Sequence, residues 1–374
     1  MQSEDPPLRY GWTTGACATA ATKAAFQALL TGVFPDPVSI TLPRGEQPAF
    51  ALAHQRLAAD TATAGIVKDA GDDPDVTHGA LVLATIRRLP PGSGVRFKAG
   101  IGIGTVTRTG LPVAVGEPAI NPVPRKMMQA VVAELAAAHG VAGDVEIEIS
   151  IPDGEQLALR TLNGRLGILG GLSILGTTGI VVPYSCAAWI NGIHRGVDVA
   201  LGMGLTHVAG ATGNTSEQAV LRHHGLGEQA LLDMGDFVGG MLKYIRSHPV
   251  PRVTIAGGVA KMAKLGQGML DLHSKRGSVD LAALGDQALA AGGSAGLRQQ
   301  IVAANTAAEA FALAAAAGIA LGDVVAQAAW LTAARLLDDP AIILDVLLFD
   351  RDGRLMGQAP PHPAYDPSRP RKRR

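Results

Sequence analysis

Hydrophobic and polar positions predict a long helix near the start of the chain and a series of short strands after it. Residues 13–32 read "TTGACATAATKAAFQALLTG", with a polar start, an Ala-rich body and a closing glycine, as expected for a capped helix. Segments typical of strands, bounded by Gly and Pro, are "VSITLP", "AFALAH", "TAGIVK", "ALVLATIRRL", "VRFKAGIGIGTVT" and "VEIEISIP". A second helix is expected in "NPVPRKMMQAVVAELAAAHG". We therefore predict an α+β domain over residues 1–170.

The pattern changes near residue 175, where strands and helices begin to alternate. Strands are expected at "GIVVP", "THVAGATG" and "RVTIAGG", and helices at "SCAAWINGIHRGVDVALGMG", "NTSEQAVLRHHG", "EQALLDMGDFVGGMLKYIRSH" and "VAKMAKLGQG". Alternation of this kind is typical of a mostly parallel sheet covered by helices. Ala-rich helices follow to about residue 338, and "AIILDVLLFD" with "GRLMGQA" is expected to close the sheet as a hairpin. We predict a Rossmann-like α/β domain over residues 171–374, with a disordered basic tail from about residue 360.

Composition narrows the class of protein. The 374 residues include 32 basic and 32 acidic side chains, so no overall field attracts nucleic acid or an acidic membrane. The two cysteines make no disulfide framework. The start of the chain lacks the pattern of a signal peptide, and the apolar segment at residues 308–322 contains Glu309 and is too short for a membrane span. These features predict a soluble cytoplasmic protein.

Residues 67–80, "VKDAGDDPDVTHGA", concentrate four aspartates beside Lys68 in a chain with only 17% charged residues. Three interpretations are open: a metal loop, an acid/base site, or a solvated turn. The spacing fails the EF-hand pattern, which needs oxygen ligands at alternating positions before a glycine and a later glutamate. An acid/base site is the sharper alternative, because clustered carboxylates raise one another's pKa.

Glycine-rich segments suggest places where a ligand could approach the backbone. "TTGACA" at residues 13–18 puts free N–H groups at a helix start, which favours a carboxylate or phosphate. Cys17 would lie in the first turn, where the helix dipole lowers the pKa of a thiol. "GTTG" at residues 176–179 and "GATGN" at residues 210–214 each lie beside a predicted strand, although neither matches a dinucleotide or P-loop fingerprint.

The ten histidines give no metal constellation by spacing. His223 and His224 are neighbours, so on a helix they point about 100° apart and cannot chelate as an i, i+4 pair would. We expect no metal site of the protein's own. Arg125 and other basic residues are candidates to pair with carboxylates of a ligand, namely Lys126, Arg160 and Arg165.

Several of these segments, in their order along the chain, resemble the cobalt-precorrin-5B C1-methyltransferase family, CbiD. The resemblance runs from about residue 8 to about residue 280, and more loosely beyond. It rests on "LRYGWTTGACATAATKAA", "VKDAGDDPDVTHGA", "GIGIGTVTRTGLPVAVGEPAINPVPRKM", "RLGILGGLSILGTTGIVVPYS", "GNTSE" and "AKMAKLGQGMLDLHSKRGSVD".

The resemblance implies a cytoplasmic enzyme of anaerobic cobalamin biosynthesis. Its reaction would move a methyl group from S-adenosylmethionine to ring carbon 1 of cobalt-precorrin-5B, giving cobalt-precorrin-6A and S-adenosylhomocysteine. Cobalt would enter only as part of this corrinoid substrate. A homo-oligomer is possible, and neither nucleic acid nor membrane is an expected partner. The alternatives are a non-catalytic tetrapyrrole carrier of the same pathway and a nicotinamide-dependent oxidoreductase, against which the missing G-x-G-x-x-G argues.

Residue roles follow from the layout of the chain. An aspartate of the loop is expected to act as a base or to balance charge at the macrocycle, so the predicted catalytic residues are Asp69 and Asp72. Anion-binding groups are expected to hold the carboxylates of the substrate, and the remaining aspartates are expected to hold the loop. The predicted substrate-binding residues are Thr13, Thr14, Gly15, Lys68, Asp73, Asp75, Asn121 and Arg125. The methyl donor is expected at the carboxyl edge of the second sheet, on Gly176, Thr177, Thr178, Gly179, Gly210, Gly213, Asn214 and Glu217.

Overall fold

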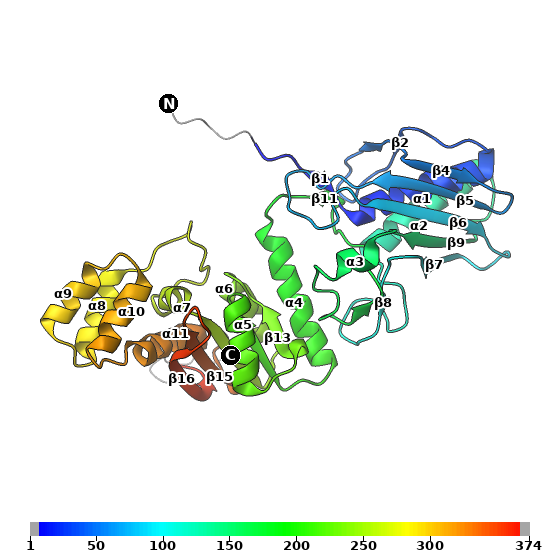
Figure 1. Ribbon diagram of the computed structural model, residues 1–374. Coiled ribbons are helices and arrows are strands. Elements are labelled where there is room, and N and C mark those ends of the chain that lie inside the picture. The colour runs from blue at the N-terminus through cyan, green and yellow to red at the C-terminus, as the bar shows by residue number, and fades with distance from the viewer. Residues whose placement is uncertain (1–6, 367–374) are drawn as a thin grey trace, which may run out of the picture. The chain divides into compact units, whose positions relative to one another are not determined.

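A computed structural model describes residues 7–366 of the chain (Figure 1). Contacts divide the chain into unit 1, Met1–Cys186, and unit 2, Ala187–Arg374. The expected pair of sheet-containing regions with helices is confirmed. The contact-based division falls later in the chain than the domain boundary predicted at residue 170, which stays a prediction.

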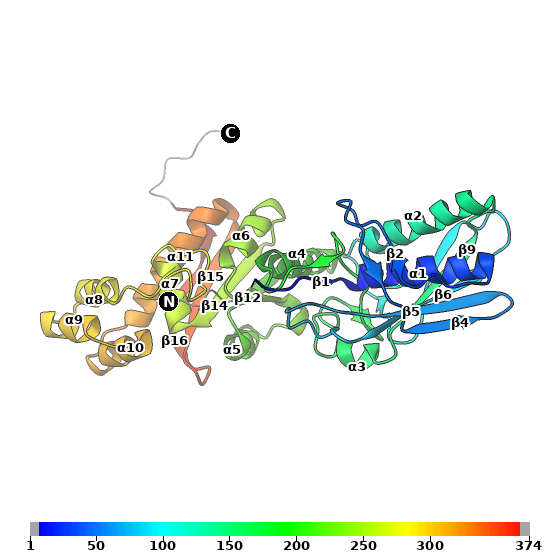
Figure 2. The same ribbon diagram turned by 90° about the horizontal axis from the view of Figure 1, so that it is seen from above.

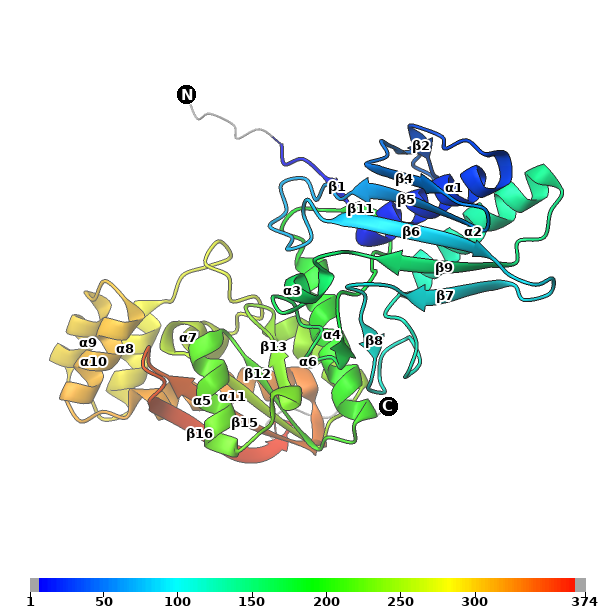
Figure 3. The ribbon, with the colours of Figure 1, turned by 45° about the vertical axis from the view of Figure 1, so that its right-hand side comes forward.

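The main sheet of unit 1 has five strands in the order β4-β5-β6-β9-β7. All neighbours pair antiparallel except β7 and β9, which are parallel, and Figure 3 shows β5, β6, β9 and β7 side by side in this order. The bounds are β4 His54–Leu57, β5 Thr61–Val67, β6 Leu81–Arg88, β7 Val95–Ala99 and β9 Val145–Ser150. Alternate residues of β6 and β9 are buried, so one face of this sheet supplies the core.

Two 18-residue helices complete this core, α1 (Thr14–Thr31) and α2 (Pro122–His139) (Figure 2). The Ala-rich sequence of α1 has few bulky side chains, so its backbone lies close to β5, β6 and α2, and most of its residues are buried. The two helices run parallel: a Cβ on Gly15 would lie 2.7 Å from Pro124, and Lys23 pairs with Glu134 further along. Their starts therefore lie together.

Smaller elements complete unit 1. Three two-stranded pairs are antiparallel, and α3 (Gly154–Ala158) is a short helix. The pairs are β1 (Gly11–Trp12) with β11 (Ile180–Val181), β2 (Val38–Ser39) with β3 (Ala49–Phe50), and β8 (Thr105–Val106) with β10 (Ile168–Leu169). The predicted strand "GIVVP" is therefore wrong in its burial and its partner: β11 is half-buried and pairs with β1, not with the sheet of unit 2.

The sheet of unit 2 has the order β13-β12-β14-β15-β16. The first four strands pair parallel, and β16 returns antiparallel beside β15, so the predicted closing hairpin is confirmed. The bounds are β12 His207–Ala211, β13 Leu231–Asp233, β14 Arg252–Gly258, β15 Asp339–Phe349 and β16 Leu355–Ala364.

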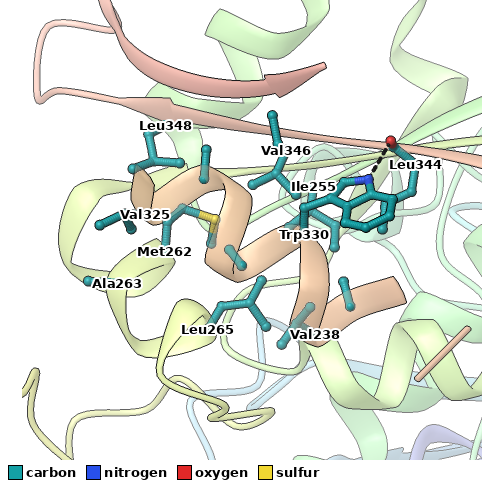
Figure 4. Close-up of a cluster of buried hydrophobic side chains, with 14 of the residues drawn as sticks. Val238, Ile255, Met262, Ala263, Leu265, Val325, Trp330, Leu344, Val346 and Leu348 are labelled. Carbon is teal, nitrogen blue, oxygen red and sulfur yellow. Dashed lines mark hydrogen bonds between the residues drawn. The ribbon is translucent and has the colours of Figure 1, made fainter. Parts of the chain in front are cut away.

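Helices cover both faces of this sheet. The helix α5 (Asn214–His224) packs on one face with Ala209, Ala256 and Leu347. The other face carries the larger core, in which the Trp330 indole donates to the Leu344 carbonyl at 2.9 Å (Figure 4). Helices that contribute to this larger core are α4 (Cys186–Gly202), α6 (Val238–Ser247), α7 (Val259–Gly266), α8 (Leu281–Ala290), α9 (Ala295–Val302), α10 (Ala307–Ala316) and α11 (Leu321–Leu337).

Two further predictions need correction. The segment "EQALLDM" is not helical throughout, because a 3₁₀ turn at Glu228–Ala230 leads into β13, the short edge strand. The tail predicted to be disordered from residue 360 begins too early, since residues 360–364 lie in β16 and pair with β15. The rest of that prediction, residues 367–374, lies outside the described residues. Within residues 7–366, no helix is long and apolar enough to cross a membrane.

Candidate functional site

The aspartate-rich loop connects β5 to β6 at the end of the unit 1 sheet. Lys68 continues the pairing, donating its N–H to the Ala80 carbonyl at 2.9 Å and accepting from Gly79 at 2.8 Å. The segment before α1 crosses this loop, with the Trp12 N–H donating to the Asp69 carbonyl at 2.7 Å. The crossing leaves no room for a side chain, because a Cβ on Gly11 would lie 2.0 Å from the Ala70 backbone.

Lys68 is the buried centre of this loop. Its side chain is 1% exposed and its Nζ lies 2.7 Å from Oδ2 of Asp75. The other oxygen of Asp75 accepts from the Thr77 N–H at 2.8 Å and the Thr77 hydroxyl at 2.6 Å. Burial alone would raise the pKa of Asp75, but the charge and hydrogen bond of Lys68 and the donors of Thr77 outweigh it and lower that pKa. Asp75 therefore stays ionised and holds Lys68.

Arg9 organises two further aspartates. Its guanidinium forms a bidentate pair with the Asp69 carboxylate, one bond being 3.0 Å, and its backbone N–H donates to Asp72 at 2.6 Å. The hydrogen bond from Arg9 and a second from the Gly71 N–H lower the pKa of Asp69 to about 2. Asp73 accepts from the Tyr184 N–H at 2.8 Å.

The expectation that these carboxylates raise one another's pKa is therefore wrong for Asp69 and Asp75. Each has a cationic partner, Arg9 or Lys68, whose attraction together with nearby N–H and O–H donors outweighs desolvation by burial. Asp69 and Asp75 are therefore ionised, and a group with a pKa near 2, such as Asp69, is a poor proton acceptor at neutral pH. Asp69 is suited to balance positive charge.

The start of α1 lies against the loop that contains residues 175–179. The Thr13 hydroxyl caps the helix by accepting from the Ala16 N–H at 3.2 Å. The Gly15 N–H donates to the Leu175 carbonyl at 3.0 Å, and the Thr14 hydroxyl accepts from the Leu175 N–H at 3.0 Å. These polar groups of the predicted anion site are thus hydrogen-bonded within the protein.

Cys17 follows in the first turn and is fully buried. The expectation of a lowered thiol pKa is wrong: desolvation raises the pKa of Cys17 to about 12, although the charge of Lys68 opposes this. Cys17 is a packed residue of the core, unsuited to act as a nucleophile.

A groove of about 700 Å³ lies along β7 and the first turns of α2. Arg125 stacks 5.1 Å over the Phe97 ring, and its guanidinium donates to Glu117 and to the carbonyls of Pro118 and Ile120. Arg125 therefore fixes the segment before α2. The groove is further lined by two exposed cations and apolar side chains: Arg96, Lys126, Val95, Pro112 and Val113. Asn121 lies at the start of α2 and makes no side-chain cap.

The two glycine loops predicted for the methyl donor lie in different units. Residues 176–179 belong to unit 1, where the Gly179 carbonyl accepts from the Thr13 N–H at 2.9 Å. The expectation that this loop lies at the carboxyl edge of the second sheet is therefore wrong, because β11 beside it pairs with β1. Thr177 is exposed, and the Thr178 hydroxyl accepts from the Ile180 N–H at 3.2 Å.

The second loop does follow a strand of the parallel sheet. It leaves β12 after Ala211 and enters α5 at Asn214, with Gly213 as the N-cap residue. Gly210 is packed within the strand, where a Cβ would lie 2.3 Å from the Met241 sulfur. Glu217 is buried in the first turn of α5.

The neighbouring strand β14 ends in a similar loop that sequence reasoning missed. Gly258 is the N-cap residue of α7. A Cβ on Gly213 or on Gly258 would meet nothing within 4 Å, and neither helix start has a side-chain cap. Because α5 and α7 leave adjacent strands toward opposite faces of the sheet, their starts flank a topological switch point, where α/β sheets bind ligands. Lys261 pairs here with Asp236 at 3.0 Å.

Sequence reasoning also missed Arg9 and Tyr184 as partners of the aspartate loop. Neither is adjacent to the loop in sequence, and only the strand pair β1–β11 brings both toward it. The only local signal was the segment "LRYGW", which directly precedes the predicted helix.

Comparison with known proteins identifies relatives of this chain. The family model described as CbiD matches residues 1–183, and that described as CbiD, C-terminal domain, matches residues 271–360. A cobalt-precorrin-5B C(1)-methyltransferase of Agrobacterium fabrum is 60% identical over 368 residues, covering 98% of this chain and 97% of its own. One of Paramagnetospirillum magneticum is also 60% identical, covering 96% and 99%.

A solved structure is also similar to part of the chain. It is the cobalamin biosynthesis protein (cbiD) of Archaeoglobus fulgidus, 26% identical, with 74% of this chain and 86% of that chain covered and a TM-score of 0.40. The family matches and the near-complete alignment with the curated relatives establish that the chain belongs to the CbiD family.

Proposed function

We propose that this protein is a methyltransferase that acts on carbon 1 of cobalt-precorrin-5B with S-adenosylmethionine as donor. The observation that carries this function is the 60% identity over 98% of the chain to a relative named cobalt-precorrin-5B C(1)-methyltransferase. In the reaction, the bond between the methyl carbon and sulfur breaks, its electron pair stays on sulfur, and ring carbon 1 supplies the pair for the new bond. The products are cobalt-precorrin-6A and S-adenosylhomocysteine, in the anaerobic route to cobalamin.

Unit 1 carries the groups that suit the substrate. The macrocycle bears carboxylate side chains, and the groove along β7 offers Arg96 and Lys126 beside apolar side chains. We assign the carboxylates of the substrate to these two cations, and to Arg125 the role of holding the wall of the groove. The sulfonium donor needs no covalent nucleophile, so catalysis consists mainly of alignment and electrostatic support.

The aspartate loop supplies the electrostatic support in this proposal. Asp69 and Asp72 present negative charge held by Arg9, and the low pKa of Asp69 assigns it to charge balance, not to proton removal. Lys68, Asp73 and Asp75 hold the loop. Asp69→Asn and Asp72→Asn should lower kcat more than they lower stability, and an equal loss of activity and melting temperature would contradict this role.

We assign the donor to the switch point of unit 2. The open starts of α5 and α7 leave backbone N–H groups for the carboxylate and hydroxyls of S-adenosylmethionine. Gly213, Asn214 and Gly258 would approach the donor, with Glu217 behind the first turn. The loop 176–179, which lies on α1, stays a prediction as a donor contact, as does Gly210.

The test of the function is a mass spectrum of cobalt-precorrin-5B after incubation with the purified protein and S-adenosylmethionine. We expect a product heavier by one methylene unit, which forms only with the donor, and a methyl label at carbon 1 by NMR. If the folded protein binds the substrate but leaves it unchanged, the methyltransferase function is wrong and the protein is a non-catalytic carrier.

A further inference from the structure

A buried polar cluster lies on the α5 face of the unit 2 sheet, at the starts of its strands and so at the opposite end from the glycine loops. His207 is the first residue of β12, His224 is the last residue of α5, and Asp345 lies in β15. These three residues are far apart in the sequence, yet each places one nitrogen or oxygen within 4.8 Å of the others.

The three atoms converge on one point, which the Thr254 hydroxyl marks. This hydroxyl lies 2.8 Å from Nε2 of His207, 3.2 Å from Nε2 of His224 and 3.0 Å from Oδ2 of Asp345. A hydroxyl has one proton and two lone pairs, so it can satisfy all three groups and hold them together without an ion. Nε2 of His224 also lies 3.0 Å from Oδ2 of Asp345. The cluster is therefore preorganised, and small side-chain rotations that open this contact would give the ~3.4 Å separation of tetrahedral ligands at zinc.

The chemistry of these groups matches a metal ion. Imidazole nitrogens bind a metal ion in their neutral form, and carboxylates in their ionised form. Two imidazoles and one carboxylate are a ligand set typical of zinc and related divalent ions, with a fourth position left for water.

The surroundings support such a site. Oδ1 of Asp345 accepts from Arg252 Nε at 3.2 Å, which orients the carboxylate as supporting partners of metal ligands do. An ion at Oδ2 would replace the contacts of that oxygen with His224 and Thr254. His207 and His224 are only partly buried, so an ion and its water can enter beside the imidazoles.

We propose that His207, His224 and Asp345 form a binding site for a divalent transition-metal ion of the zinc type. The ion would join β12, β15 and the end of α5, and so fasten α5 to this face of the sheet. This inference does not depend on the methyltransferase function, because the cluster lies at the other end of the strands from the proposed donor loops.

The test uses the full-length protein, stripped with a chelator and titrated with Co²⁺. We expect one Co²⁺ per chain with visible absorption bands of a four- or five-coordinate ion, which Zn²⁺ displaces. His207→Gln and His224→Gln each keep an amide that can hydrogen-bond to Thr254 but lose the imidazole lone pair. By analogy with partners of metal ligands, we expect each to weaken binding by about 100-fold or more.

His223→Gln is the matched control, since His223 is adjacent to His224 but is absent from the converging group. It should bind Co²⁺ as the wild type does. Zn²⁺ should raise the melting temperature of the wild type and of His223→Gln, but not of the other two variants. Equal Co²⁺ affinity and spectra in all four proteins, or no bound Co²⁺ in the folded wild type, would overturn the proposal and leave the cluster as a hydrogen-bond network.

Discussion

The helix starts of the two units differ in how their polar groups are used. In unit 1, Thr13 caps α1 and Leu175 accepts from Gly15, so the protein occupies its own donors. In unit 2, α5 and α7 begin at Gly213 and Gly258 without side-chain caps and with open space beside each glycine. A glycine-rich helix start can thus be packed against another segment of the protein or be open to a ligand. Only the residues that contact it in the fold distinguish the two cases.

One ion pair in each unit shows a similar difference in exposure. The pair in the aspartate loop is closed: Lys68 is 1% exposed and bound to Asp75. At the switch point of unit 2, Lys261 is 36% exposed beside Asp236, and its Nζ also donates to the Thr212 carbonyl at 3.1 Å. The pair in the aspartate loop is therefore withdrawn from water, whereas the pair at the switch point is partly exposed.

The prediction with the largest expected effect concerns the buried ion pair of unit 1, Lys68 with Asp75. Asp75→Asn leaves the buried Lys68 without a counter-charge, and the free energy of unfolding should fall by about 3–5 kcal/mol. The matched control is Glu148→Gln, whose partner Lys98 lies at the same 2.7 Å but is 55% exposed; it should cost about 0.5 kcal/mol. Denaturant titration measures the free energy of unfolding of both variants. Similar losses of stability would show that the buried pair and the exposed pair do not differ in their contribution.

Gly258→Val tests the open helix starts. Gly258 has φ −67° and ψ 152°, which valine adopts, and space beside it, so stability should stay unchanged. The side chain would fill the donor site, and affinity for S-adenosylmethionine should fall by at least about tenfold, or about 1.4 kcal/mol. Calorimetric titration measures this, with Gly164→Val, also beside open space in unit 1, as the control. Wild-type affinity in Gly258→Val would place the donor elsewhere.

Thr13→Ala tests whether the start of α1 has a structural role. Loss of the hydrogen bond to the Ala16 N–H should lower the free energy of unfolding by about 1 kcal/mol. Thr13→Ser keeps the cap oxygen and should retain most of that stability in thermal and denaturant unfolding. If both variants keep full stability but Thr13→Ala loses substrate affinity, the hydroxyl belongs to the ligand and not to the fold.

The smallest effect concerns the pH dependence of Asp69. Its pKa in the folded state is about 2, below the value of about 3.9 in an unfolded chain. The stability it contributes is therefore complete above pH 5 and is lost as the pH falls toward 2. Since Asp69 is 43% exposed, the contribution should be at most about 1 kcal/mol. Stability curves of the wild type and Asp69→Asn should stay apart above pH 5 and converge below pH 4; parallel curves down to pH 2 would contradict the Arg9 pair.

Local patterns sufficed for much of the fold. The long helices α1 and α2, the alternating strands around β6 and the closing hairpin β15–β16 all carry their signals within a few residues. The three-residue strand β13 was missed because a segment that short shows no periodicity of its own. The strand β11 was misassigned because its apolar residues fit a buried strand equally well, and its partner β1 lies far away in the sequence.

The site was less predictable, because its chemistry depends on contacts between distant segments. The aspartate loop was visible as a cluster, but the direction of its pKa shifts depends on Arg9, about 60 residues earlier. The sequence around Gly258 matches no ligand-binding fingerprint. Gly258 and Gly213 come together only because β12 and β14 lie side by side in the sheet. His207, His224 and Asp345 likewise converge only in the folded sheet.

The last strand of unit 2 also affects how this sheet meets other chains. β16 lies at one edge of the sheet, and its sequence includes Pro360, Pro361 and Pro363. Proline has no N–H to offer, so an incoming strand would find donors missing at these positions. The opposite edge is the three-residue β13, too short to template a long pairing. The two edges together discourage uncontrolled strand addition between copies, and an oligomer of this protein would form through other surfaces.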